Sequence, residues 1–168
     1  MTLEGLLTNA KALKKDMESG QLTRDVLMRH GSHIVEQQRI QLLMGKGSDG
    51  QDLHPFYSED TKPSGYFKSG ASARAYAAWK QTLRYPYSVQ RNPDAPNLYI
   101  TGVFHDDLNV EFYPDQMAIV PDTAYAAKIM AKYGYGVFGL CPMMWDVIWN
   151  DFGARDELIE EMRKVLWQ

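Results

Sequence analysis

The stretch LNVEFYPDQMAIV, residues 108–120, decides the fold class of this chain. In its first half the apolar residues Leu108, Val110 and Phe112 alternate with polar ones, and after the residues PDQ a second apolar run follows. Alternation with a period of two is the pattern of a half-buried strand, and Pro114 with its polar neighbours marks a turn between two such strands. The stretch therefore predicts a β-hairpin.

Upstream of the hairpin the apolar residues recur with helical spacing. A stripe at three- and four-residue steps predicts a first helix that Gly20 ends. A second, longer helix is expected to start from an N-cap at Thr23 and to stop before Gly45, although Gly31 weakens its middle. The alanine-rich residues 71–83 predict a third helix. Its apolar face is expected to hold Ala75, Ala78, Trp79 and Leu83.

Downstream of the hairpin the sequence also favours helices. Asp122 is expected to cap a helix that ends at Gly134, and Pro142 to stand in the first turn of another. Gly153 interrupts that helix, and a last one is predicted over residues 156–166. These elements predict an α+β fold. We expect a single domain over residues 1–168, in which a small antiparallel hairpin packs against several helices and long aromatic loops, with N-terminal helices over residues 1–44 and a helical tail over residues 142–168.

Composition narrows the class of function. A chain of 168 residues with 45% hydrophobic content can bury a core without disulfides or metals. Its 18 basic and 21 acidic residues give a net charge of −3, which argues against nucleic acid as a partner. The single cysteine, Cys141, excludes an intrachain disulfide and a cysteine zinc cluster. No window approaches the roughly 18 consecutive apolar residues of a membrane span, so we expect a soluble protein made in the cytoplasm, with no membrane partner.

Two loops combine turn-forming residues with aromatic ones. Residues 45–70 and 84–97 are rich in glycine or proline, yet both carry large rings. Disordered linkers lack aromatic residues because nothing in them has to be buried, so these loops are expected to dock, and another subunit is a candidate partner. With two tryptophans of the predicted C-terminal helices, the candidate interface residues are Phe56, Tyr57, Tyr66, Phe67, Tyr85, Tyr87, Trp145 and Trp149. Core positions are expected for Trp79, Phe104, Phe112 and Phe138.

The triplet His105-Asp106-Asp107 is the best candidate for acid–base chemistry. A histidine titrates near neutrality, and adjacent carboxylates can split their pKa values. Neighbouring strand residues point to opposite faces, however, and no serine, cysteine or lysine stands in an activated-nucleophile motif. We therefore favour a solvated turn that leads into the strand at Leu108, and we expect no catalytic residue.

Metal and phosphate sites are weaker candidates. His30 and His33, three residues apart, could bind a metal with Glu36, but paired histidines on a mixed helix are more often structural. Residues 45–50, GKGSDG, lack the ending of a phosphate-binding loop and do not join a strand to a helix. We expect neither a metal nor a cofactor.

An ordered set of short motifs carries a family resemblance. QLLMGKGSDGQDLHPFY (41–57) is followed by AYAAWK (75–80), PNLYITGVF (96–104), KYG (132–134) and FGL (138–140). In this order the motifs resemble small virion-morphogenesis and tail-completion proteins of bacteriophages, particularly structural proteins of phages that infect gut Bacteroidetes. The similarity covers roughly residues 35–140, so the C-terminal helical stretch lies outside it.

The resemblance implies a structural protein of the virion. Such proteins look like single α+β domains that form homo-oligomeric rings at the head–tail junction, as neck or connector, tail-completion or tail-terminator subunits beside the portal, connector or tail tube. No catalytic residue is associated with the motifs. Two alternatives stay open. One is a small hydrolase or metal-dependent enzyme that uses His105, Asp106 and Asp107, or the pair His30 and His33. The other is a phage accessory protein that binds a host factor.

Overall fold

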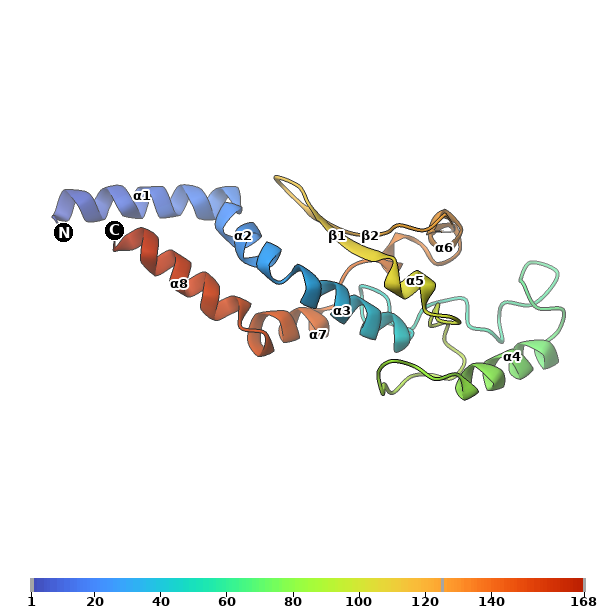
Figure 1. The fold of residues 1–168 in the computed structure, drawn as a ribbon. Helices are drawn as coiled ribbons and strands as arrows, with labels where there is room; N and C mark the ends of the chain where they lie inside the picture. The colour runs from blue at the N-terminus through green and yellow to red at the C-terminus, as the bar shows by residue number, and fades with distance from the viewer. Residues whose placement is uncertain (1, 125, 168) are drawn as a thin grey trace.

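A long central helix and a two-stranded hairpin organise the chain (Figure 1). The computed structural model describes residues 2–124 and 126–167. The molecule is elongated, with two helices and both chain ends at one extremity and an aromatic loop region at the other. The helices are α1 (Leu3–Ser19), α2 (Gln21–Arg29), α3 (Gly31–Leu43), α4 (Gly70–Thr82), α5 (Val103–Asp106), α6 (Ala126–Tyr133), α7 (Pro142–Asp146) and α8 (Ala154–Leu166), with a 3₁₀ turn at Tyr135–Val137 and a π-helical turn at Val147–Asp151.

The predicted hairpin is confirmed. Strands β1 (Leu108–Phe112) and β2 (Met117–Pro121) pair antiparallel, with Val110 opposite Ile119. Leu108 and Ile119 are buried in the main core, while the polar residues that alternate with them on β1 are exposed. The hairpin packs on α3, so the α+β fold class is confirmed as well.

Helix α3 is the centre of the main core because it is buried on most of its circumference. Ile34 and Leu42 are fully buried, and so are the amides of Gln38 and Gln41. The Gln38 amide donates to Val137 O at 3.2 Å and accepts from Gly139 N at 2.8 Å. Gln41 donates to Gly139 O at 2.8 Å and accepts from Cys141 N at 2.7 Å. Each amide thus donates one hydrogen bond to the same segment of backbone and accepts one from it, and this holds residues 137–141 against α3.

The N-terminal helices differ from the prediction in one respect. Gly20 ends α1 as expected, in the left-handed region at φ 68°, and α3 stops before Gly45. The expected second helix is instead two helices, α2 and α3, which meet at His30. Thr23 lies inside α2 and is not its N-cap. Next to this break, a Cβ on Gly31 would meet Val110 at 3.3 Å, so the glycine lets the hairpin approach the helix closely.

The C-terminal helices follow the predicted signals. Pro142 stands in the first turn of α7, and Gly153, at φ 79°, separates the π-helical turn from α8, which starts two residues earlier than predicted. Helix α6 starts at Ala126 and is followed by Gly134 in the left-handed region. Asp122 stands four residues before Ala126, so the predicted cap at Asp122 is wrong. Within the described residues, no helix is both long and apolar enough to cross a membrane.

The loop over residues 45–70 folds back on its own chain. Tyr57 and Phe67 are buried with Ala73 of α4 in a second apolar cluster. The Tyr57 ring stands edge-on to both Phe67 and Tyr76, and Tyr57 N donates to Asp94 O at 2.9 Å. Tyr57 and Phe67 are therefore not surface residues for a partner, and that part of the predicted interface is wrong. The loop finds its apolar partner in α4 rather than in another subunit.

Helix α4 buries a different face from the one predicted. Its inner stripe runs Ala73, Tyr76, Ala77 and Lys80, at steps of three, one and three residues. Trp79 lies beside this stripe and is 43% exposed, so its predicted core position is wrong. Phe104 is buried as predicted, and Phe112 and Phe138 are partly buried against the main core.

Candidate assembly surface

Helices α1 and α8 form an arm at one extremity of the molecule. They run side by side in opposite directions, so the first and last parts of the chain lie together at its tip (Figure 1). Leu13 is the buried residue of α1, and Ala154 that of α8. The two helices contact each other without enclosing a core between them.

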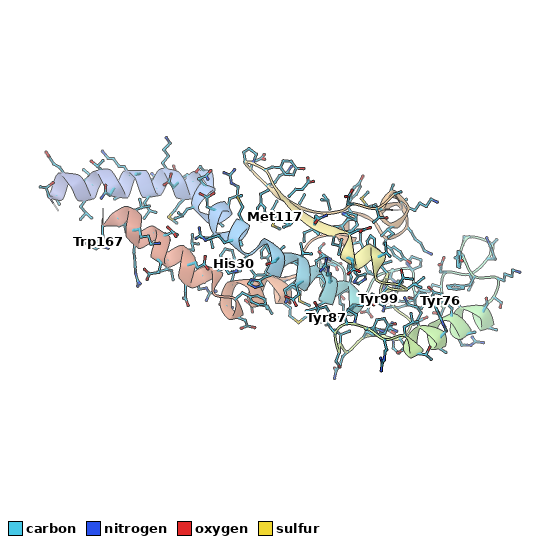
Figure 2. The ribbon with its side chains drawn as sticks, viewed as in Figure 1. His30, Tyr76, Tyr87, Tyr99, Met117 and Trp167 are labelled. Carbon is cyan, nitrogen blue, oxygen red and sulfur yellow. The ribbon has the colours of Figure 1, made fainter. Side chains whose placement is uncertain are left out.

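The arm exposes large apolar side chains along its length. Leu3 is 84% exposed and Trp167 is 67% exposed, and Trp167 projects at the tip of the arm in Figure 2. Leu7, Met17 and Ile159 are exposed as well. Because one helix-to-helix contact buries only one stripe on each helix, the remaining apolar side chains stay in water. Burying each of them would contribute roughly 1.5–3 kcal/mol. This is the surface that a neighbouring molecule would cover.

Polar contacts hold the arm in place. At its tip, Asn9 Nδ2 donates to Leu166 O at 3.3 Å. At its base, Arg29 pairs with Glu157 at 3.0 Å and with Glu161 at 3.4 Å. The hydrogen bond from Arg29 is the main cause that lowers the pKa of Glu157, although burial opposes it. Bonds at both ends fix the direction in which the arm presents its apolar residues.

The remaining residues of the predicted interface are divided between surface and core. Tyr66 is exposed, with the Lys132 ammonium 5.8 Å from its ring centre. Phe56 is half-buried, and the hydroxyls of Tyr85 and Tyr87 donate within the chain, to Lys80 O and to Glu36. Trp145 and Trp149 pack partly against the main core.

His105 is a core residue. It lies in α5, is buried, and its Nε2 donates to Asn97 O at 3.1 Å. Burial lowers its pKa to about 4, so the ring is neutral at physiological pH. Asp106 is exposed on the same short helix, and the Arg39 guanidinium donates to the backbone oxygens of His105 and Asp106. The expected solvated turn is therefore wrong for His105, whose surroundings are those of a structural residue.

The groups of the other predicted sites also make their contacts within the chain. His30 and His33 meet through their Nδ1 atoms at 3.3 Å, and His33 stacks on Phe152 at 4.0 Å. In the part of the chain that the structure describes, no three histidine, cysteine or acidic residues are grouped to hold a metal ion. In the glycine loop, Gly47 N donates to Gln51 O and Ser48 N to Gly136 O, so these amides are not directed at an anion.

The arm residues were missed as a site although their stripe is visible in the sequence. The apolar spacing before Gly20 predicts an amphipathic helix, and such a stripe is normally read as a core contact. Comparison with protein-family models, with curated proteins and with solved structures finds no match to this chain.

Proposed function

We propose that this protein is a structural subunit of a phage virion at the head–tail junction, a neck or connector, tail-completion or tail-terminator protein that assembles as a homo-oligomeric ring. The observation that carries the assembly function is the exposed apolar face of the α1–α8 arm. The phage context comes from the ordered motifs in residues 35–140, which resemble tail-completion proteins.

A second copy of the chain is the occupant that best fits the arm. The body of the molecule carries a groove of about 580 Å³ beside β2. Its lining is almost wholly apolar and includes Met117, Ile119, Met130, Tyr135, Phe138 and Trp145. Tyr135 is strongly exposed, and Trp145 was already a candidate interface residue from the sequence. The chain thus offers two unlike apolar surfaces, a projecting arm and a groove in the body.

Two unlike surfaces on one chain favour a ring. When a surface of one copy binds a different surface of the next, the contact is heterologous, and it closes into a ring if the rotation between copies allows. Contacts of this kind also repeat around the ring, so a moderate contribution from each arm is multiplied by the number of subunits. Seating the arm of one copy in the groove of the next accounts for both exposed surfaces.

The oligomeric state of the purified chain tests the assembly. Size-exclusion chromatography coupled to light scattering should give a multiple of the monomer mass for the wild type. The double variant Leu3→Ser/Leu7→Ser should give the monomer mass, with unchanged helical content. A matched control, Lys11→Ser/Lys15→Ser, changes exposed polar residues of the same helix and should keep the oligomer. A wild-type monomer at all concentrations would contradict ring assembly, and absence of the protein from purified virions by mass spectrometry would contradict the phage role.

A further inference from the structure

A cavity lies at the opposite extremity from the arm, between α4, α6 and residues 96–102. Its volume is about 430 Å³. Its wall is formed mainly by aromatic and aliphatic side chains, and Figure 2 shows Tyr76 on α4 and Tyr99 close to this region. The lining residues that matter here are Tyr57, Tyr76, Lys80, Leu98, Ile129 and Tyr133.

Lys80 is the one cationic residue in that wall, and it is only 1% exposed. Its ammonium donates to Tyr99 O, which uses one of three protons. Lys80 takes part in none of the salt bridges formed by the described residues. Burial, and to a smaller extent the charge of Arg91, lowers the pKa of the amine to about 8. A buried ammonium without a carboxylate partner is costly, so an anion that reached it would be stabilised.

Two other buried polar atoms without a hydrogen-bond partner belong to residues that are next in sequence to residues of the cavity wall. Among the described residues, Asn97 Nδ2 and His105 Nδ1 are buried without a hydrogen-bond partner. The His105 ring lies 5.2 Å from the Tyr99 ring, measured between ring centres, and Lys80 donates to Tyr99 O, so both side chains contact the same residue. Leu98 has φ 53°, a left-handed conformation that is costly for a leucine. A strained residue in the wall of a cavity, with unpaired polar groups on the residues next to that wall, is a feature that binding sites often show.

We propose that this cavity binds a carboxylate carried on an apolar body, with the carboxylate paired to Lys80 and the body held by the tyrosine rings. The volume is within the range of small-molecule pockets. The lining contains no acidic side chain that would repel the ligand. Asp60, which lies near Tyr133, is neutralised by its ion pair with Lys132. Phosphate fits less well, because it favours several donors and the wall offers one cation.

The carboxylate can come from a free small molecule or from an acidic side chain of a neighbouring subunit. The chemistry at Lys80 is the same in both cases. The two sources differ in where the site is empty: a neighbour's side chain would fill it only in the assembled protein, whereas a free ligand would enter both the assembled and the monomeric chain.

The test is a titration of the full chain with 4-phenylbutyrate and with the uncharged 4-phenylbutanol. The carboxylate should bind better than the alcohol, and Lys80→Met should weaken carboxylate binding roughly tenfold to a hundredfold while leaving the alcohol unchanged. Lys128→Met, an exposed lysine on α6 next to the cavity wall, should bind as the wild type. Equal binding of the two probes by the Leu3→Ser/Leu7→Ser monomer, or no loss when Lys80→Met is added to that monomer, would overturn the proposal.

Two further measurements keep the test decisive. If Lys80→Met does not fold, Ile129→Trp fills the cavity and should abolish binding while Lys80 stays in place. In the Leu3→Ser/Leu7→Ser monomer, made with ¹³C-labelled lysine, the NMR signal of the Lys80 amine should shift when 4-phenylbutyrate is added. An unshifted signal would count against the proposal. Comparing the oligomer with the Leu3→Ser/Leu7→Ser monomer then separates the sources: binding by both supports a free ligand, and binding by the monomer alone supports a neighbouring side chain.

Discussion

The arm and the body of this molecule use helices in opposite ways. In the body, α3 is buried on most of its circumference, and even its glutamine amides are satisfied by neighbouring backbone. In the arm, α1 is 17 residues long and buries Leu13 alone, while Leu3 and Leu7 stay in water. The body is complete within one chain and the arm is not. The proposed assembly would bury the apolar side chains that the arm leaves exposed.

The largest effect in this comparison is expected from a core residue of the body. Leu42 is fully buried in α3, so Leu42→Ala removes apolar contacts and leaves a cavity. We expect the free energy of unfolding to fall by about 2–5 kcal/mol, measured by urea denaturation. A loss below about 1 kcal/mol would mean that α3 is not the centre of the core.

A somewhat smaller effect is expected from pH. The folded-state pKa of His105 is lowered to about 4 from an ordinary value near 6.5, so between these values the unfolded chain binds more protons. Stability should therefore fall as pH drops from about 6.5 to 4, by about 3 kcal/mol from this residue. His105→Asn should flatten the fall, whereas His54→Asn, which changes an exposed histidine, should not. The same slope in both variants would show that another group is responsible.

The smallest effect on the monomer is expected in the arm. Leu7 is exposed, so Leu7→Ser should change the free energy of unfolding of a dilute monomer by less than about 0.5 kcal/mol. At concentrations where the protein is assembled, the same variant should lower the apparent melting temperature, because assembly adds stability by mass action. A large loss in the monomer would place Leu7 in an intrachain contact and remove the contrast with Leu42.

The sequence predicted the elements with strong local signals. Alternation in residues 108–120 was enough for the hairpin, and Gly20, Pro142 and Gly153 marked helix limits that the structure confirms. The sequence did not predict features that depend on contact with an element far away in the chain. Beside the break at His30, Val110 comes close to Gly31, and neither residue signals the other in the sequence.

The candidate site was harder to predict than the fold. Tyr57 and Phe67 were expected at a partner because their loop is rich in glycine and proline, but α4 lies within reach and covers them. Trp79 was expected in the core, but it is partly exposed and the adjacent Lys80 is buried, since a shift of one residue on a helix turns the side chain by about 100°. Exposure of the arm depends on how little of α1 the shorter α8 covers, which spacing alone does not determine.

The most direct test of the assembly surface is a photo-crosslink from the tip of the arm. A photoreactive phenylalanine derivative placed at Trp167 would be activated in the assembled protein, and the linked peptides identified by mass spectrometry. If the arm of one copy sits in the groove of the next, links are expected to the groove beside β2, at residues such as Met117 or Trp145, in a second copy of the chain. Links only within one copy, or only to a different protein, would contradict it.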